Sequence, residues 1–95
     1  MAVVAELLIL RATRSDADLL DERMGQTMQQ AGGPPDGLMV HVGRPTKDGL
    51  LITDVWRTEG EWQTFFDGTL LPLIDECGLS ADKPTISPVW QFGRP

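Results

Sequence analysis

His41 is the only histidine in the sequence, and imidazole is the side chain whose ordinary pKa suits proton transfer near neutral pH. The turn residues of Arg44–Gly49 lie between two apolar segments, which is typical of a β-hairpin. A hairpin loop centred on Lys47 and Asp48 would place His41 directly opposite Asp54. A carboxylate beside the imidazole fixes its tautomer, so the pattern predicts an acid–base pair in which Asp54 is the partner of His41.

The same pair has a structural interpretation, in which a cross-strand hydrogen bond merely stabilises the hairpin. The register of the hairpin is critical for both interpretations. A slip of one residue would place His41 and Asp54 on opposite faces of the sheet. The catalytic and structural interpretations both remain open from the residues alone.

Aromatic side chains are the candidates for lining a ligand pocket, because pockets for flat or apolar molecules are mostly aromatic and aliphatic. The candidates are Trp56, Trp62, Phe66 and Trp90. Trp56 shares a predicted strand face with Asp54. The helical spacing of Trp62 and Phe66 also fits ordinary core packing.

Other chemistries find no support in the residue pattern. One histidine and one cysteine, Cys77, give no zinc-binding spacing, and there is no glycine-rich phosphate loop of recognised form. Cys77 lies on an apolar helical stripe, so we expect it to be buried and inert. We interpret the acidic residues between Asp16 and Glu22 as a solvated helix start, and we expect neither a metal nor an organic cofactor.

Glu6 is an acidic residue inside the apolar run Val3–Leu10. It either points into a pocket with a raised pKa or pairs with an arginine, and the pairing with Arg57 or Arg11 is the favoured interpretation. Alternation along the strand places it on one face with Val4, Leu8 and Leu10.

Length and charge limit the class of protein. The 95 residues fit one domain, residues 1–95, and the net charge of −6 argues against binding to nucleic acid. The apolar run Ala2–Leu10 is too short to span a membrane, which takes about 20 residues. A single cysteine favours a reducing compartment, so we expect a cytoplasmic protein with no membrane partner.

The elements that must position these residues follow from periodicity and end signals. Ser15 is the expected N-cap of a first helix that ends at Ala31–Pro35, and Thr58 with Glu61 forms a capping box before a second helix. Pro72 predicts a kink in that helix near Gly68, and Gly78 closes it. The predicted strands are Val3–Leu10, Leu38–Val42, Leu50–Arg57 and Pro84–Phe92.

Alternation within Leu38–Val42 predicts Met39 and His41 on one face, and Leu38 with Val40 and Val42 on the other. Pro88, in the middle of the last predicted strand, predicts an edge position or a bulge.

The order strand, helix, strand, strand, helix, strand predicts an α+β fold of ferredoxin-like βαββαβ type. It would have a four-stranded antiparallel sheet with both helices on one face. The first strand is apolar on both faces, so we expect a second subunit to cover the face that the helices leave open.

The segments His41–Gly49 and Ile52–Thr58, followed by Phe65-Phe66 and Leu71-Pro72, resemble the antibiotic biosynthesis monooxygenase-like branch of the dimeric α+β barrel superfamily. The resemblance covers nearly the whole chain. It implies a homodimer whose two sheets face each other as a barrel, a pocket between the sheet and the helices of each subunit, and a Trp56 that lines it.

This sequence departs from parts of that family. It has no Asn and no Tyr, so the polar pocket residues of the cofactor-free oxygenases have no counterpart beyond Trp56. Haem-degrading members hold iron through a histidine on the second helix, and no histidine lies between Glu59 and Cys77.

The resemblance therefore implies a small-molecule pocket protein, similar to cofactor-independent monooxygenases that act on apolar aromatic or polyketide-like substrates. A polyketide cyclase or isomerase on the same scaffold is one alternative. A non-catalytic ligand-binding or dimerisation module is the other.

Overall fold

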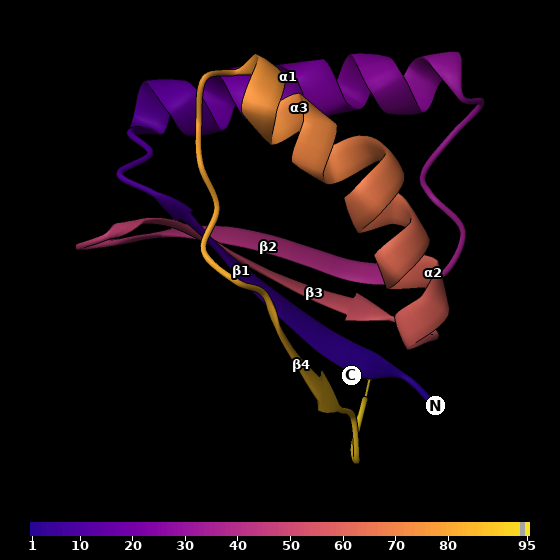
Figure 1. Cartoon of the computed structure of the whole chain (residues 1–95). Coiled ribbons are helices and arrows are strands. Elements are labelled where there is room, and N and C mark those ends of the chain that lie inside the picture. The colour runs from indigo at the N-terminus through magenta and orange to yellow at the C-terminus, as the bar shows by residue number, and fades with distance from the viewer. Residues whose placement is uncertain (94) are drawn as a thin grey trace.

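The computed structural model describes residues 1–93 and 95. Strand β1 is followed by helix α1, the hairpin β2–β3, a second helical region and strand β4, which is the predicted βαββαβ order (Figure 1). The second helical region contains α2, a π-helical turn and α3. The bounds are β1 Val3–Leu10, α1 Arg14–Gln30, β2 Leu38–Thr46, β3 Gly49–Trp56, α2 Glu59–Phe65, the π turn Phe66–Leu70, α3 Leu71–Glu76 and β4 Thr85–Pro88.

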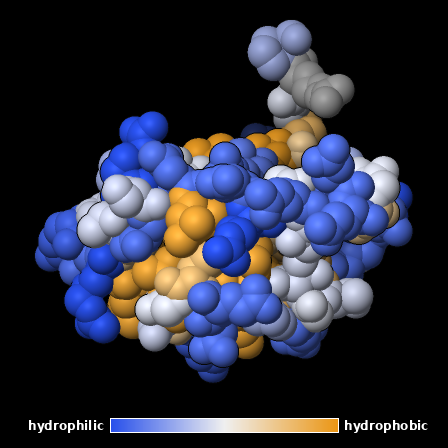
Figure 2. All heavy atoms as spheres, turned by 90° about the horizontal axis from the view of Figure 1, so that it is seen from above, coloured by the Kyte–Doolittle hydropathy of each residue, from blue (hydrophilic) through white to orange (hydrophobic). Residues whose placement is uncertain are grey.

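The four strands form one antiparallel sheet in the order β2-β3-β1-β4, and the helices all lie on one side of it (Figure 1). The predicted α+β ferredoxin-like fold is thereby confirmed. Seen from the helix side, polar side chains cover most of the surface and apolar ones show between them (Figure 2). None of the helices within the described residues is long and apolar enough to cross a membrane.

Strand β1 lies between β3 and β4, and its two faces differ in burial. On the helix side, Val3, Ala5, Leu7 and Ile9 are buried. On the other side, which we call the open face, Val4, Leu8 and Leu10 are half-buried and Glu6 is exposed. The predicted sharing of one face by these four residues is confirmed, and only one face of β1 is covered within the chain.

Aromatic residues at and after the end of β3 form part of the core. Trp56 is fully buried, and its ring centroid lies 5.3 Å from that of Phe65. Trp62 stacks on Phe66 at 5.0 Å. These contacts anchor the second helical region to the sheet, because large buried aromatic surfaces contribute strongly to packing.

Helix α1 begins at Arg14 with Thr13 as its N-cap, so the prediction of Ser15 as the N-cap was wrong. The Thr13 hydroxyl accepts from the Asp16 N–H at 3.2 Å, and the Asp16 carboxylate accepts from the Thr13 N–H at 2.9 Å. This reciprocal capping box satisfies two backbone donors. Asp18, which lies three residues after Ser15, accepts instead from the Arg14 side chain at 3.1 Å.

Helix α2 begins at Glu59 with Thr58 as its N-cap, as predicted. The Thr58 hydroxyl accepts from the Glu61 N–H at 3.2 Å. The Glu61 carboxylate does not return to the Thr58 backbone, because it binds Arg57 and the Thr58 hydroxyl instead. Only half of the predicted capping box is therefore present.

The predicted disturbance before Pro72 is confirmed as the π-helical turn Phe66–Leu70. Pro72 has no N–H to offer Gly68, and the Leu71 N–H donates to the carbonyl of Phe66, five residues back. Helix α3 ends at Glu76, and Gly78, the predicted closing residue, follows two residues later with a left-handed φ of 73°.

The β2–β3 hairpin turns at Lys47 and Asp48, with Thr46 opposite Gly49. Strand β2 is longer than predicted and contains a bulge between Leu38 and Val40. The bulge places Leu38 opposite Trp56, on the helix side with His41, so the prediction that Leu38 shares a face with Val40 was wrong.

Strand β4 is shorter than the predicted Pro84–Phe92 and pairs only with β1. Its edge position, which Pro88 predicted, is confirmed. The other edge strand, β2, also carries a proline, Pro45. Trp90 lies beyond β4 and is 90% exposed.

Glu6 accepts a hydrogen bond from the Thr53 hydroxyl at 3.3 Å across the open face. Arg57 pairs with Glu61, and within the described residues neither Arg57 nor Arg11 pairs with Glu6. The favoured ion pair was therefore wrong, since a neighbouring strand brings a hydroxyl closer than either guanidinium.

Candidate functional site

His41 and Asp54 meet across the β2–β3 hairpin in the predicted register. The distance from His41 Nδ1 to Asp54 Oδ1 is 2.7 Å. The two-residue turn at Lys47 and Asp48 fixes this register, because it pairs Thr46 with Gly49 and the pairs beyond follow in order along the two strands.

The carboxylate of Asp54 is buried, and both of its oxygens have partners. Its side chain is 7% exposed, and the indole Nε1–H of Trp56 donates to Oδ2 at 3.4 Å. The second contact comes from a fully buried ring, so it restricts the orientation of the carboxylate. Trp56 thus acts on His41 indirectly, by helping to hold the group that orients it.

The imidazole of His41 has one protected side and one accessible side, and it is 52% exposed. In its neutral form, Nδ1–H donates to Asp54, which leaves the lone pair on Nε2 free to accept a proton. The hydrogen bond to Asp54 raises the pKa of His41 above 6.5, partly opposed by burial, and the negative charges of Asp54 and Asp21 raise it further. The pair is thus built as a proton acceptor.

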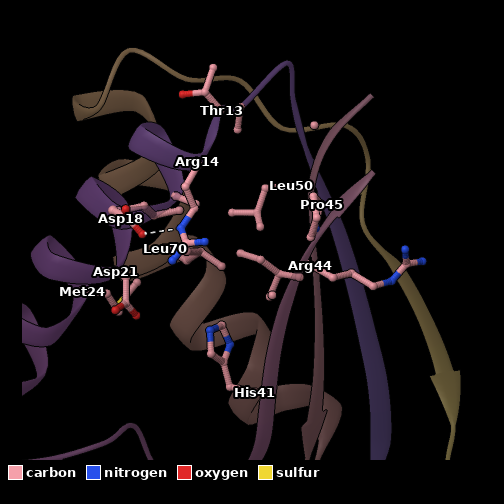
Figure 3. Close-up of a pocket in the computed structure, with 16 residues that line it drawn as sticks. Thr13, Arg14, Asp18, Asp21, Met24, His41, Arg44, Pro45, Leu50 and Leu70 are labelled. Carbon is pink, nitrogen blue, oxygen red and sulfur yellow. Dashed lines mark hydrogen bonds and ion pairs between the residues drawn. The ribbon is translucent and has the colours of Figure 1, made fainter. Parts of the chain in front are cut away.

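A cavity of about 630 Å³ lies between α1 and the β2–β3 hairpin, and His41 is part of its wall (Figure 3). Leu20 and Met24 of α1 contribute apolar surface on one side. Leu50 and Ile52 of β3 contribute it on the other. The volume lies within the range of small-molecule sites, and the mostly aliphatic wall suits an apolar ligand.

Two glycines help to create this space. Gly43 pairs with Ile52 on the helix-facing side of the hairpin, Gly49 follows the turn, and both line the cavity. A large side chain at Gly43 would fill part of the volume that separates α1 from the sheet, whereas a Cβ at Gly49 would overlap the carbonyl oxygen of Ile9. Gly43 faces the same side as His41, and that was a signal of open space which the sequence analysis did not use.

The four aromatic candidates lie away from the cavity wall. Trp56, Trp62 and Phe66 are packed in the core, and Trp90 is exposed. None of them is among the residues that line the cavity within the described chain. The apolar part of the wall is therefore aliphatic, and His41 is the aromatic residue in it. Direct contact of the four candidates with a ligand stays a prediction.

Within residues 1–93 and 95, no three His, Cys, Asp or Glu side chains gather closely enough to hold a metal ion. Cys77 is half-buried and packs against the core.

No protein-family model matches the chain, and a search of curated proteins finds no match either. Solved structures do match it over nearly its whole length. SnoaB, a cofactor-independent oxygenase from Streptomyces nogalater, superposes with a TM-score of 0.61 at 9% identity, over 96% of this chain and 93% of its own.

A candidate antibiotic biosynthesis monooxygenase from Deinococcus radiodurans superposes with a TM-score of 0.60 at 19% identity, over 100% of this chain and 98% of its own. A heme-degrading protein from Mycobacterium tuberculosis reaches 0.57 at 14% identity, over 99% of this chain and 100% of its own. These similarities show a shared fold with antibiotic biosynthesis monooxygenase-like proteins, which agrees with the resemblance seen in the sequence.

Proposed function

We propose that this chain is a small-molecule enzyme that works without a metal or organic cofactor and removes a proton from an apolar aromatic or polyketide-like substrate. The observation that carries the proposal is the position of His41. It is oriented by a buried carboxylate and forms part of the wall of an aliphatic cavity of about 630 Å³. Proton acceptors arranged in this way are a recurring feature of catalytic sites.

In the proposed reaction, Nε2 of His41 takes a proton from a phenolic or enolisable group of the bound substrate. Asp54 stabilises the imidazolium that forms, because its carboxylate lies 2.7 Å from Nδ1. The aliphatic wall holds the ring system of the substrate and excludes water, which strengthens the interaction between the charges.

The leading chemistry is oxygenation by molecular oxygen. For an anthrone, loss of a proton from the methylene carbon gives a carbanion that donates electrons to O₂. The new C–O bond becomes a carbonyl, and the second oxygen atom leaves as water, so one anthrone and one O₂ give one anthraquinone and one H₂O. The shared fold with SnoaB, itself named a cofactor-independent oxygenase, supports this choice over other reactions.

The oxygenase activity is tested by measuring oxygen uptake in air-saturated buffer that contains the protein and a reduced anthrone. We expect uptake above the buffer rate, with one O₂ consumed per anthraquinone formed. His41→Ala should remove most of it, by about tenfold or more. Val42→Ala is the matched control, since Val42 is the next residue and lies on the opposite face. Wild-type uptake equal to that of buffer would exclude the oxygenase on this substrate.

A cyclase or isomerase is the second candidate, because the His41–Asp54 pair performs proton transfer without any need of oxygen. It would exchange substrate protons with D₂O in the absence of air, which proton NMR detects. A purely non-catalytic module would show neither exchange nor uptake. The aromatic core around Trp62 and Phe66 is filled, as such a module requires, but the cavity beside His41 is open.

We also propose that the protein is a homodimer joined through the open face of the sheet. The side chains that favour this are apolar and only half-buried in the single chain: Val4, Leu8, Leu10, Leu51 and Val55. A sheet face of this kind is a self-complementary surface for a two-fold interface. The resemblance to the dimeric α+β barrels implies the same arrangement.

A further inference from the structure

The charged residues around the cavity differ in how much they contribute to the electrostatic potential inside it. Arg14 and Asp18 pair with each other at 3.1 Å, so their charges largely cancel. Arg44 lies opposite Leu51 on the open face, and its side chain extends away from the cavity in Figure 3. The groups left to set the electrostatics are Asp21, His41 and, behind the imidazole, Asp54.

Asp21 and His41 line the same cavity from its two sides, and both lie away from the hairpin turn. His41 is five residues from the end of β2, or about 16 Å along a strand. Asp21 is seven residues into α1, or about 10 Å along a helix whose start lies near the hairpin turn. Asp21 and His41 accordingly both lie toward the lower end of the cavity in Figure 3. The negative charge of Asp21 also contributes to the raised pKa of His41.

The net charge at this end of the cavity is negative whichever form His41 takes. A protonated His41 is balanced by Asp54, and Asp21 then leaves one negative charge over. A neutral His41 leaves two. Among the described residues, Asp21 forms no ion pair or side-chain hydrogen bond that would cancel its charge.

We propose that Asp21 is a specificity-determining residue that rejects ligands carrying a carboxylate and selects uncharged phenolic or enolic aromatics. The inference rests on the proposed function, because it assumes that the ligand occupies the cavity beside His41. Its physical basis is repulsion between like charges at the rim of a partly enclosed cavity. Asp21 is itself exposed, so the repulsion is modest and depends on the salt concentration.

The test uses two ligands of nearly the same shape, anthraquinone-2-carboxamide and anthraquinone-2-carboxylate, with affinities measured by isothermal titration calorimetry at low salt. Wild-type protein should bind the uncharged amide more tightly than the acid, by about threefold or more. Asp21→Asn should bring the two affinities together, mainly by strengthening binding of the acid. Raising the salt concentration should narrow the wild-type difference as well.

Glu22→Gln is the matched control, because Glu22 is the next residue of α1, is exposed and does not line the cavity. It removes the same charge from the protein and should leave the preference unchanged. Equal binding of both ligands to wild type, or a preference that survives Asp21→Asn, overturns the role of Asp21 while leaving the proposed function intact. Binding of neither ligand overturns both.

Discussion

At the scale of single residues, the Asp54 carboxylate is shared between a half-exposed imidazole and a fully buried indole. A group that is buried and satisfied on both oxygens has little freedom to reorient. The contact with Trp56 therefore matters for His41, although the indole and the imidazole do not contact each other through a hydrogen bond in the described structure. Asp54 thus links the packing of Trp56 in the core to the orientation of the His41 imidazole at the cavity.

Replacing the charge of Asp54 while keeping its shape isolates this effect. Asp54→Asn should lower the pKa of His41, because the hydrogen bond to the carboxylate is the largest cause of its elevation. Proton NMR titration of the imidazole measures the change directly. We expect activity on the anthrone substrate to fall by about tenfold or more. Asp75→Asn, an exposed substitution with the same loss of charge, should leave both quantities unchanged.

The raised pKa of His41 also predicts opposite pH dependences for stability and activity. The folded protein holds the proton more tightly than the unfolded chain, so the stabilisation is fully present below about pH 6.5 and is lost as the pH rises through the folded pKa. Activity needs the deprotonated imidazole and should rise over that same interval.

The pH dependence of stability is measured by urea unfolding of wild type and His41→Gln at several pH values. The difference in free energy of unfolding between the two should shrink as the pH rises above about 6.5. A difference that grows with pH would contradict the assignment. Asp54 and Asp21 are the charged groups that face the imidazole, so their variants should reduce the effect.

At the scale of elements, the hairpin is tied to β1 at Gly49. This residue has a φ of 141°, and a Cβ there would overlap the carbonyl oxygen of Ile9. Gly49→Ala should therefore destabilise the protein by more than about 2 kcal/mol, because both the backbone conformation and the close approach are unfavourable for alanine. Thermal or urea unfolding provides the measurement.

The matched control is Gly43→Ala in the same hairpin. Its Cβ would meet only a Leu50 methyl group at 3.5 Å, which is an ordinary contact. We expect little change in stability, but the added methyl group enters the cavity wall and should weaken binding of a large ring system. Equal destabilisation by both alanines would show that Gly49 is not a special position.

The sequence analysis succeeded where local chemistry decides the structure. The turn at Lys47 and Asp48 fixes the register that brings His41 to Asp54, and that register is readable from the residues. The bulge before Val40 has no such signal, so Leu38 was placed on the wrong face. The N-cap was missed because Ser15 and Thr13 are both good capping residues and each has an aspartate three residues later, so the local sequence does not distinguish them.

The resemblance implied a pocket between the sheet and the helices, but its volume and its wall could not be predicted from the sequence, because they depend on how far α1 lies from the hairpin. Leu20 and Met24 are on the apolar stripe of α1, which any packed helix would show. Leu20 is buried and Met24 only partly so, although they are neighbours on that stripe. That difference arises from the tertiary packing of α1, which periodicity does not contain.

At the scale of the whole molecule, the proposed dimer makes a direct prediction about mass. Wild-type protein should sediment at twice 10.5 kDa, and Leu8→Lys should sediment as a single chain, because it places a charge in the middle of the open face. Leu71→Lys is the control on the helix side, where Leu71 is 42% exposed. Analytical ultracentrifugation at several concentrations distinguishes the two, and a wild type that stays at 10.5 kDa contradicts the dimer.

The prolines on the two outer strands have a consequence for aggregation. Pro45 lies in β2 and Pro88 in β4. The pairing of their neighbours with the adjacent strand leaves each proline nitrogen on the solvent side of its strand. A further strand that approached either edge of the sheet would lack one backbone N–H donor. At β2 it would also meet the bulge. Growth into fibrils by edge-to-edge strand addition is thereby disfavoured on both sides. The proposed dimer instead uses the flat face of the sheet, and such an association stops once that face is covered.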